Sequence, residues 1–156
     1  MNDEKTCPTN GKGSCPVRAF LVPFGVVFAV NFVFEWLLHG VILMPTYQET
    51  AALWRPEPEM QSLFLWGILQ QLVTAAVITC LYCCIAKNSE CGGQCPRKGA
   101  IFGLKIGLLL GVTHAGGYVY MPIPAGLALS WLVGYIVLGV MIGVALSFLA
   151  RMCRKT

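Results

Sequence analysis

Four long apolar segments make up most of this chain and constrain its fold more than any other feature. Each is longer than the ~20 residues that a helix needs to cross a bilayer. None alternates polar and apolar residues as a barrel strand does, and helices are the other structure that satisfies backbone groups in lipid. We therefore predict an all-α membrane protein in which four transmembrane helices form one bundle. The predicted helices are residues 19–44, 61–86, 99–120 and 124–150.

The composition agrees with this class and argues against a soluble protein. Hydrophobic residues are 56% of the chain and charged residues 12%, and the mean hydropathy is +0.69. An ordinary soluble domain has about 25% charged residues. The first 18 residues are polar, and the apolar run after them is too long for the core of a cleavable signal. We expect a multi-pass protein whose main partner is the lipid bilayer.

The basic residues predict the orientation of the helices. Nine of them flank the apolar segments on what would be one side of the membrane: Lys5, Lys12, Arg18, Lys87, Arg97, Lys98, Arg151, Arg154 and Lys155. The first loop on the other side has only Arg55, beside three glutamates. Because positive residues favour the cytoplasm, we predict a cytoplasmic tail (1–18), loop (87–98) and basic C-terminus (151–156). The plasma (inner) membrane is the expected location, and the net charge of +4 then reflects topology, with no nucleic-acid partner.

Asn31, Glu35 and His39 follow one another at intervals of four, so they share one face of the first predicted helix. A carboxylate at bilayer depth costs a few kcal/mol or more, and such residues mark functional sites by default. The sequence therefore predicts a site on this face. The following segment, Thr46 to Trp54, is expected to form a short interfacial helix on the outer surface.

A second helix brings a histidine to a similar depth. At about 1.5 Å rise per residue, Glu35 and His114 both lie about fifteen residues from the inner surface. If the first helix docks on the third, Glu35, His39 and His114 converge in the outer half of the bundle. Four further polar side chains are candidates to surround this site: Asn31, Gln70, Gln71 and Tyr118.

Three interpretations of this predicted cluster remain open. Two histidines and a carboxylate suit zinc, iron or manganese as metal ligands. The same groups suit a relay of protons or cations, because histidine titrates near neutrality. The third interpretation is an internally satisfied polar cluster that holds the helices in register. No Ser-His-Asp, phosphate-loop or paired-carboxylate pattern is present, so we do not expect a common hydrolase or nucleotide enzyme.

Eight cysteines fall in the predicted cytoplasmic segments or near the cytoplasmic ends of helices. Thiols in a reducing compartment point to metal binding, redox chemistry or packing, and not to disulfides. Cys7, Cys15, Cys91 and Cys95 would supply the four thiolates of a closed metal site, although their spacing is not that of a standard zinc knuckle. Soft-metal or redox handling is therefore an alternative function.

Small residues recur at every fourth position of the third predicted helix, from Gly99 to Ala115, and the fourth helix continues the theme. Such stripes let helix backbones approach closely in lipid. We predict that Gly103, Gly107 and Gly111 pack against the first helix or against another chain. In the second case, the protein is a homo-oligomer or a noncatalytic accessory subunit of a membrane complex.

Overall fold

The structure, a computed structural model, describes residues 16–87 and 93–153 and is helical throughout, with no strand in these ranges. Four helices are long and apolar enough to cross a membrane, which confirms the predicted helical membrane fold. Their candidate spans are Phe20–Ile42, Phe64–Ala86, Pro96–Val119 and Ala125–Met152. The corresponding long helices are α1 (Pro16–Leu37), α4 (Phe64–Lys87), α5 (Pro96–Ala115) and α6 (Ala125–Cys153).

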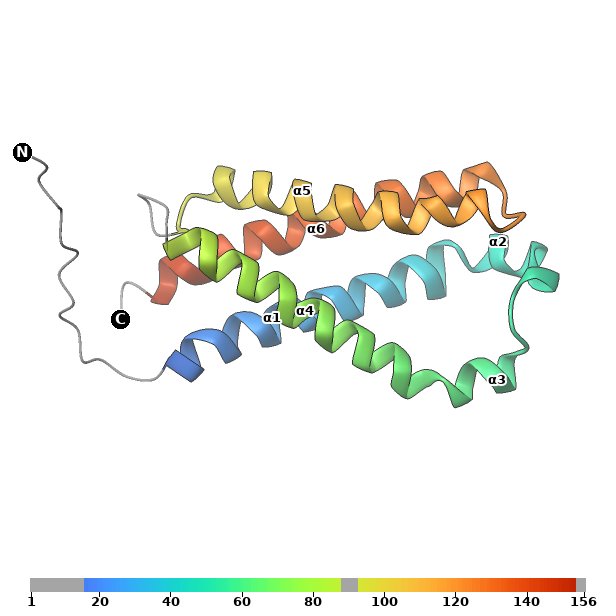
Figure 1. Cartoon of the computed structure of the whole chain (residues 1–156), viewed down its shortest axis with the longest axis horizontal. Coiled ribbons are helices and arrows are strands. Elements are labelled where there is room, and N and C mark those ends of the chain that lie inside the picture. Colours follow the sequence, from blue (N-terminus) through green and yellow to red (C-terminus); the bar gives the residue numbers. More distant parts are fainter. Residues whose placement is uncertain (1–15, 88–92, 154–156) are drawn as a thin grey trace, which may run out of the picture.

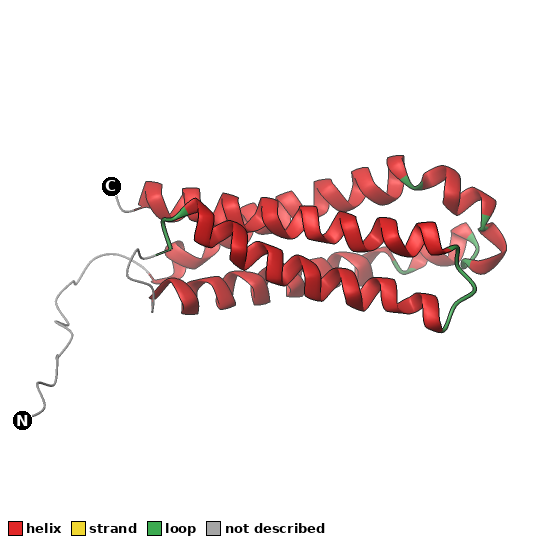
Figure 2. Cartoon of the chain, turned by 90° about the horizontal axis from the view of Figure 1, so that it is seen from above, coloured by secondary structure: helices red, strands yellow, loops and turns green. Residues whose placement is uncertain are grey.

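The long helices run side by side as an elongated bundle (Figures 1 and 2). Helix α1 begins and α6 ends at the same end of this bundle. At the opposite end lie α2 (Met44–Glu49), the 3-10 turn η2 (Ala51–Leu53) and α3 (Glu57–Ser62), with the 3-10 turn η3 (Gly116–Val119) between α5 and α6. We call this the α2 end. The side of the membrane that each end faces stays a prediction from the basic residues.

Helices α5 and α6 form the tightest contact in the bundle, through their small residues. A Cβ added at Gly103 would overlap the carbonyl oxygen of Gly139, and one added at Gly99 would overlap that of Gly143. A Cβ at Gly107 would also overlap the α6 backbone, at the carbonyl oxygen of Tyr135, and one at Gly111 would lie 2.9 Å from that of Leu132. Only a helix without side chains on this face can approach so closely.

This contact corrects the predicted partner of the glycine face. The spacing predicted contact with the first helix or with another chain, but the face packs against α6 of the same chain. The physical reason is that α6 carries a matching face of small residues, at Gly139 and Gly143, whereas α1 carries bulky side chains. Helix α1 packs instead on α4 and on a different face of α6, where Leu38 fills the space above Gly134.

Helix α6 supplies seven of the fifteen buried apolar side chains among the described residues, and the outer faces of the bundle are apolar. The buried side chains of α6 are Leu127, Ala128, Trp131, Tyr135, Leu138, Ile142 and Leu146. Large apolar side chains such as Leu65, Trp66 and Val73 of α4 are more than half exposed. In a membrane protein these faces meet lipid chains, so their exposure needs no further partner.

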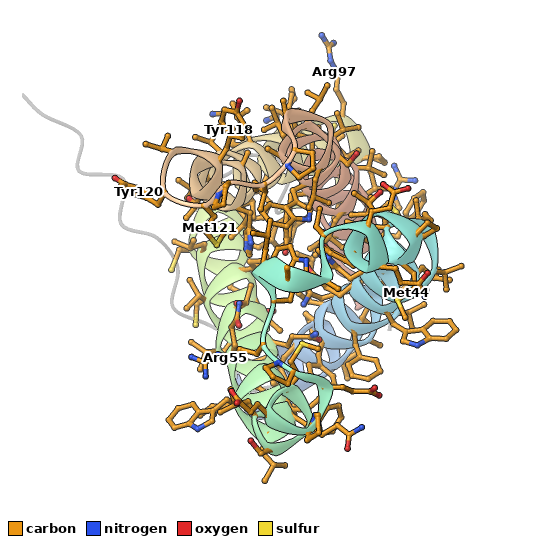
Figure 3. All side chains as sticks on the ribbon, turned by 90° about the vertical axis from the view of Figure 1, so that its right-hand side faces the viewer. Met44, Arg55, Arg97, Tyr118, Tyr120 and Met121 are labelled. Carbon is orange, nitrogen blue, oxygen red and sulfur yellow. The ribbon has the colours of Figure 1, made fainter. Side chains whose placement is uncertain are left out.

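The end of α1 changes its winding just where the polar stripe lies. Residues Leu38–Ile42 form a π-helical turn, η1, which contains His39. Such turns are rare and occur frequently at functional sites. The chain then folds back as α2, which lies across the α2 end of the bundle (Figure 3). Tyr47 and Trp54 from this segment are partly buried against the core.

Candidate functional site

A polar cavity lies between the long helices, in the half of the bundle nearer the α2 end, and all four of them line it. Its volume is about 140 Å³. Helix α1 contributes Asn31 and Glu35, and helix α6 contributes Tyr135. The remaining lining residues are Gly67, Gln70, Gln71 and Thr74 from α4, and Leu110 and His114 from α5. This is a small chamber with one carboxylate, no lysine or arginine, and several amide and hydroxyl groups.

Glu35 connects this cavity to His39. The two residues are one turn apart on the same helix face, and His39 Nε2 lies 3.2 Å from Glu35 Oε2. Both side chains are only partly accessible, with 19% of Glu35 and 30% of His39 exposed. A carboxylate at this position is therefore partnered within its own helix.

The other nitrogen of His39 contacts a tyrosine from the α2 segment. His39 Nδ1 lies 2.5 Å from the Tyr47 hydroxyl, which also accepts a 2.8 Å hydrogen bond from Trp131 Nε1. An indole N–H can only donate, so the tyrosine proton is left to point to Nδ1. A neutral His39 that accepts at Nδ1 carries its own proton on Nε2, which faces Glu35. With a neutral His39, the contacts therefore form one continuous direction of donation: Trp131 to Tyr47 to His39 to Glu35.

Aromatic packing holds this chain of hydrogen bonds in place. The Tyr47 and His39 rings stack with centroids 5.9 Å apart. Trp54 packs edge-on against Tyr47 at 5.3 Å, and also contacts Trp131 at 6.3 Å. Trp54 Nε1 donates to Thr50 Oγ1 over 2.9 Å, which fixes its orientation. Contacts with His39 on one side and with Trp54 on the other therefore hold the Tyr47 ring and its hydroxyl in place.

Burial affects the acidity of Tyr47. It raises the pKa of the phenol above the ordinary value of 10.0; the hydrogen bond from Trp131 opposes this effect, and the negative charge of Glu35 adds to it. Tyr47 is therefore a neutral hydroxyl at physiological pH, able to accept one hydrogen bond and donate another.

Tyr135 of α6 packs against both histidines. His114 stacks on the Tyr135 ring with centroids 4.2 Å apart and planes 19° apart, and His39 meets the same ring at 6.5 Å. The Tyr135 side chain lines the same cavity as Glu35. His114 lines this cavity as well. Tyr135 is 5% exposed, so this arrangement is part of the core.

The structure distributes the predicted site residues in two groups. Five of them line the cavity together: Asn31, Glu35, Gln70, Gln71 and His114. His39 lies next to this cavity, behind Glu35. Tyr118 does not line it and is 51% exposed at the α2 end of the bundle (Figure 3).

The cluster does not have the form of the predicted metal triad. Within residues 16–87 and 93–153, no group of three His, Cys, Asp or Glu side chains is placed to hold a metal ion. Both histidine rings pack against the ring of Tyr135, with centroids 4.2 Å away for His114 and 6.5 Å away for His39. Zinc, iron or manganese at Glu35, His39 and His114 stays a prediction from the sequence.

Three of the four cysteines in the predicted thiolate site, Cys7, Cys15 and Cys91, lie outside the described residues. The fourth, Cys95, is the residue before α5 and is not in a disulfide. Cys80 and Cys84 of α4 are exposed. A shared cytoplasmic metal site stays a prediction.

Sequence reasoning missed the residues that join the site together. The sequence pattern places Tyr47 in an interfacial segment, and it places Tyr135 and Trp131 in an apolar helix. One general signal was available, because buried tyrosine and tryptophan usually find a hydrogen-bond partner for their polar atom. The sequence does not show which partner each one finds.

Comparison with known proteins gives no match to a protein family, to a curated protein or to a solved structure.

Proposed function

We propose that this membrane protein relays protons between the α2 end of the bundle and the intramembrane carboxylate of Glu35, and so moves protons or cations through the cavity. The observation that carries the proposal is the hydrogen-bonded sequence Tyr47, His39, Glu35, which leads to a cavity lined by all four helices. An ionisable residue inside a membrane is by default part of an ion pathway or a proton relay.

His39 has the chemistry that such a relay requires. Imidazole titrates near neutrality and can accept a proton at one ring nitrogen while it releases one from the other. Tyr47 passes its hydroxyl proton to Nδ1 while its oxygen takes a proton from water at the α2 end. The imidazolium that forms then gives up its Nε2 proton to Glu35. The ring is neutral again, with its proton on Nδ1, and Glu35 is protonated. Rotation of the ring or return of the proton resets the pathway.

The surroundings of the relay favour transfer over a purely structural pairing. A polar pair whose only role is to hold two helices in register would join those helices directly. Glu35 and His39 instead belong to the same continuous stretch of chain. The partner that they recruit is a tyrosine on a separate short helix. On its other side, Glu35 borders an open polar chamber and not a packed apolar neighbour.

Proton flux into liposomes tests the proposal. Protein is reconstituted with an entrapped pH-sensitive dye, and a pH gradient is applied together with a potassium diffusion potential. We expect flux above that of empty liposomes, and we expect Glu35→Gln to lower it to that background. The matched control is Glu49→Gln, the same change on the exposed face of α2. Equal flux in wild type, Glu35→Gln and empty liposomes would overturn the proposal.

A further inference from the structure

We infer that the cavity binds one monovalent inorganic cation, such as Na⁺, through the Glu35 carboxylate and the amide oxygens of Asn31 and Gln71. The inference deepens the proposed function by naming the ion that the site binds. It takes one premise from that proposal, namely that the cavity is the functional site. Three features of the cavity support it.

The first feature is a buried oxygen that lacks a partner. Gln71 Oε1 is inaccessible and has no hydrogen bond to any described residue. Gln71 lines the cavity, next to Gln70 and Thr74 of the same helix. A buried carbonyl oxygen without a partner costs about 1–3 kcal/mol, so native structures seldom keep one without a ligand or water. Rotation of the Gln71 amide would turn this oxygen towards the chamber that the side chain already lines, where a cation would satisfy it.

The second feature is the kind of donor that faces the chamber. Asn31 is only 4% exposed, and its amide joins the carboxylate of Glu35 on the α1 side. Gln70, Gln71 and Thr74 add amide and hydroxyl oxygens on the α4 side. Tyr135 adds one more hydroxyl, and His114 is the single nitrogen-ligand side chain of the lining. Oxygen sets of carboxylate, amide and hydroxyl groups are those that hard cations prefer, whereas zinc and copper favour histidine and cysteine.

The third feature is the charge balance. Glu35 is the only acidic side chain that lines the cavity, and no lysine or arginine does. One negative charge balances one monovalent cation. A divalent ion would leave a net positive charge at bilayer depth, where uncompensated charge is strongly unfavourable. The charged or titratable neighbours of Glu35 are His39 on its own helix, Tyr47 on α2, His114 on α5 and Tyr135 on α6.

The size of the chamber agrees with an inorganic ion. A water molecule takes up about 30 Å³ in the liquid, so about 140 Å³ holds a cation with a few waters. The ligands come from helices that are distant in sequence, α1 and α4. Binding would therefore hold these two helices together at a level where no hydrogen bond between them is present among the described residues.

Binding of ²²Na⁺ to the purified full-length protein in detergent tests the inference. We expect saturable binding that unlabelled Na⁺ displaces and that equal concentrations of Ca²⁺ or methylammonium do not. Glu35→Gln and Gln71→Leu should each weaken binding about tenfold or more, which corresponds to 1.4 kcal/mol or more. The matched control is Gln61→Leu, which removes an exposed glutamine of α3. It should bind Na⁺ as wild type does.

A second measurement guards against variants that fail to fold. Na⁺ should raise the melting temperature of the wild type, because a ligand that binds only the folded state stabilises it. The rise should be absent in Glu35→Gln and reduced in the conservative variant Gln71→Asn. Absence of saturable binding, equal binding in Glu35→Gln, or full displacement by Ca²⁺ or methylammonium would overturn the inference.

The proposed function is judged separately, from proton flux in liposomes that contain choline in place of Na⁺. Flux that depends on Glu35 without any ²²Na⁺ binding would leave the proton relay in place and remove the cation site. Saturable ²²Na⁺ binding without proton flux would leave the cation site in place and remove the proton relay.

Discussion

The imidazole of His39 links the Glu35 carboxylate, 3.2 Å from Nε2, to the Tyr47 hydroxyl, 2.5 Å from Nδ1. Both ring nitrogens are therefore engaged, one towards the cavity and one towards the α2 end. The π-helical turn that contains His39 sets this orientation, because it alters the direction of side chains relative to a regular helix. The short helix α2 completes the arrangement from outside the long helices.

Removal of the Tyr47 hydroxyl should interrupt the relay and leave the bundle folded. Tyr47→Phe keeps the ring that stacks on His39 and Trp54, so the packing contacts remain. It leaves Trp131 Nε1 and His39 Nδ1 without their shared partner. We expect proton flux to fall about tenfold or more in reconstituted liposomes. The control Tyr120→Phe, on an exposed tyrosine, should behave as wild type.

The same variant should change the response of stability to alkaline pH. The folded-state pKa of Tyr47 is raised above 10.0, so its contribution to stability is complete below pH 10.0 and is lost as pH rises towards the folded-state value. The melting temperature of the wild type should therefore fall more steeply above pH 10.0 than that of Tyr47→Phe. Parallel curves for the two proteins would show that Tyr47 is not buried as described.

The close contact of α5 with α6 should be sensitive to a single added methyl group. In Gly103→Ala the Cβ would overlap the backbone of Gly139, so the helices must separate. We expect a loss of about 1–3 kcal/mol of stability, seen as a lower melting temperature in detergent. The matched control is Gly126→Ala on α6, where nothing lies within 4 Å of the added atom. Equal melting temperatures for both variants would contradict the described packing.

Thiol labelling tests the predicted orientation in the membrane. In a protein whose other cysteines are replaced, Cys95 lies at the α4–α5 connection, and an introduced Gln48→Cys lies at the α2 end. The basic residues predict that an impermeant maleimide added to intact cells reaches position 48 and not Cys95. The opposite labelling pattern would reverse the topology, although it would leave the site geometry unchanged.

The number and nature of the long helices followed from sequence, because lipid allows few alternatives to an apolar helix. The shared depth of the cavity residues Glu35, His114 and Gln71 could also be predicted from the sequence, because the residue count and the helix rise give each one a position along its helix. The packing partner of Gly103 could not be predicted in the same way. A stripe of small residues specifies that another helix approaches closely, but it does not specify which helix. The contacts of Tyr47 and Tyr135 depend on how the chain folds back at η1, which no local pattern in the sequence encodes.

Chemical rescue of His39 tests the central claim most directly. His39→Ala leaves space for a free imidazole beside Glu35 and Tyr47, and proton flux is measured in liposomes with and without added imidazole. A proton relay predicts flux reduced about tenfold or more in His39→Ala. It also predicts restoration by imidazole in this variant but not in Glu35→Gln. Wild-type flux in His39→Ala, or reduced flux that imidazole leaves unchanged, would contradict the relay.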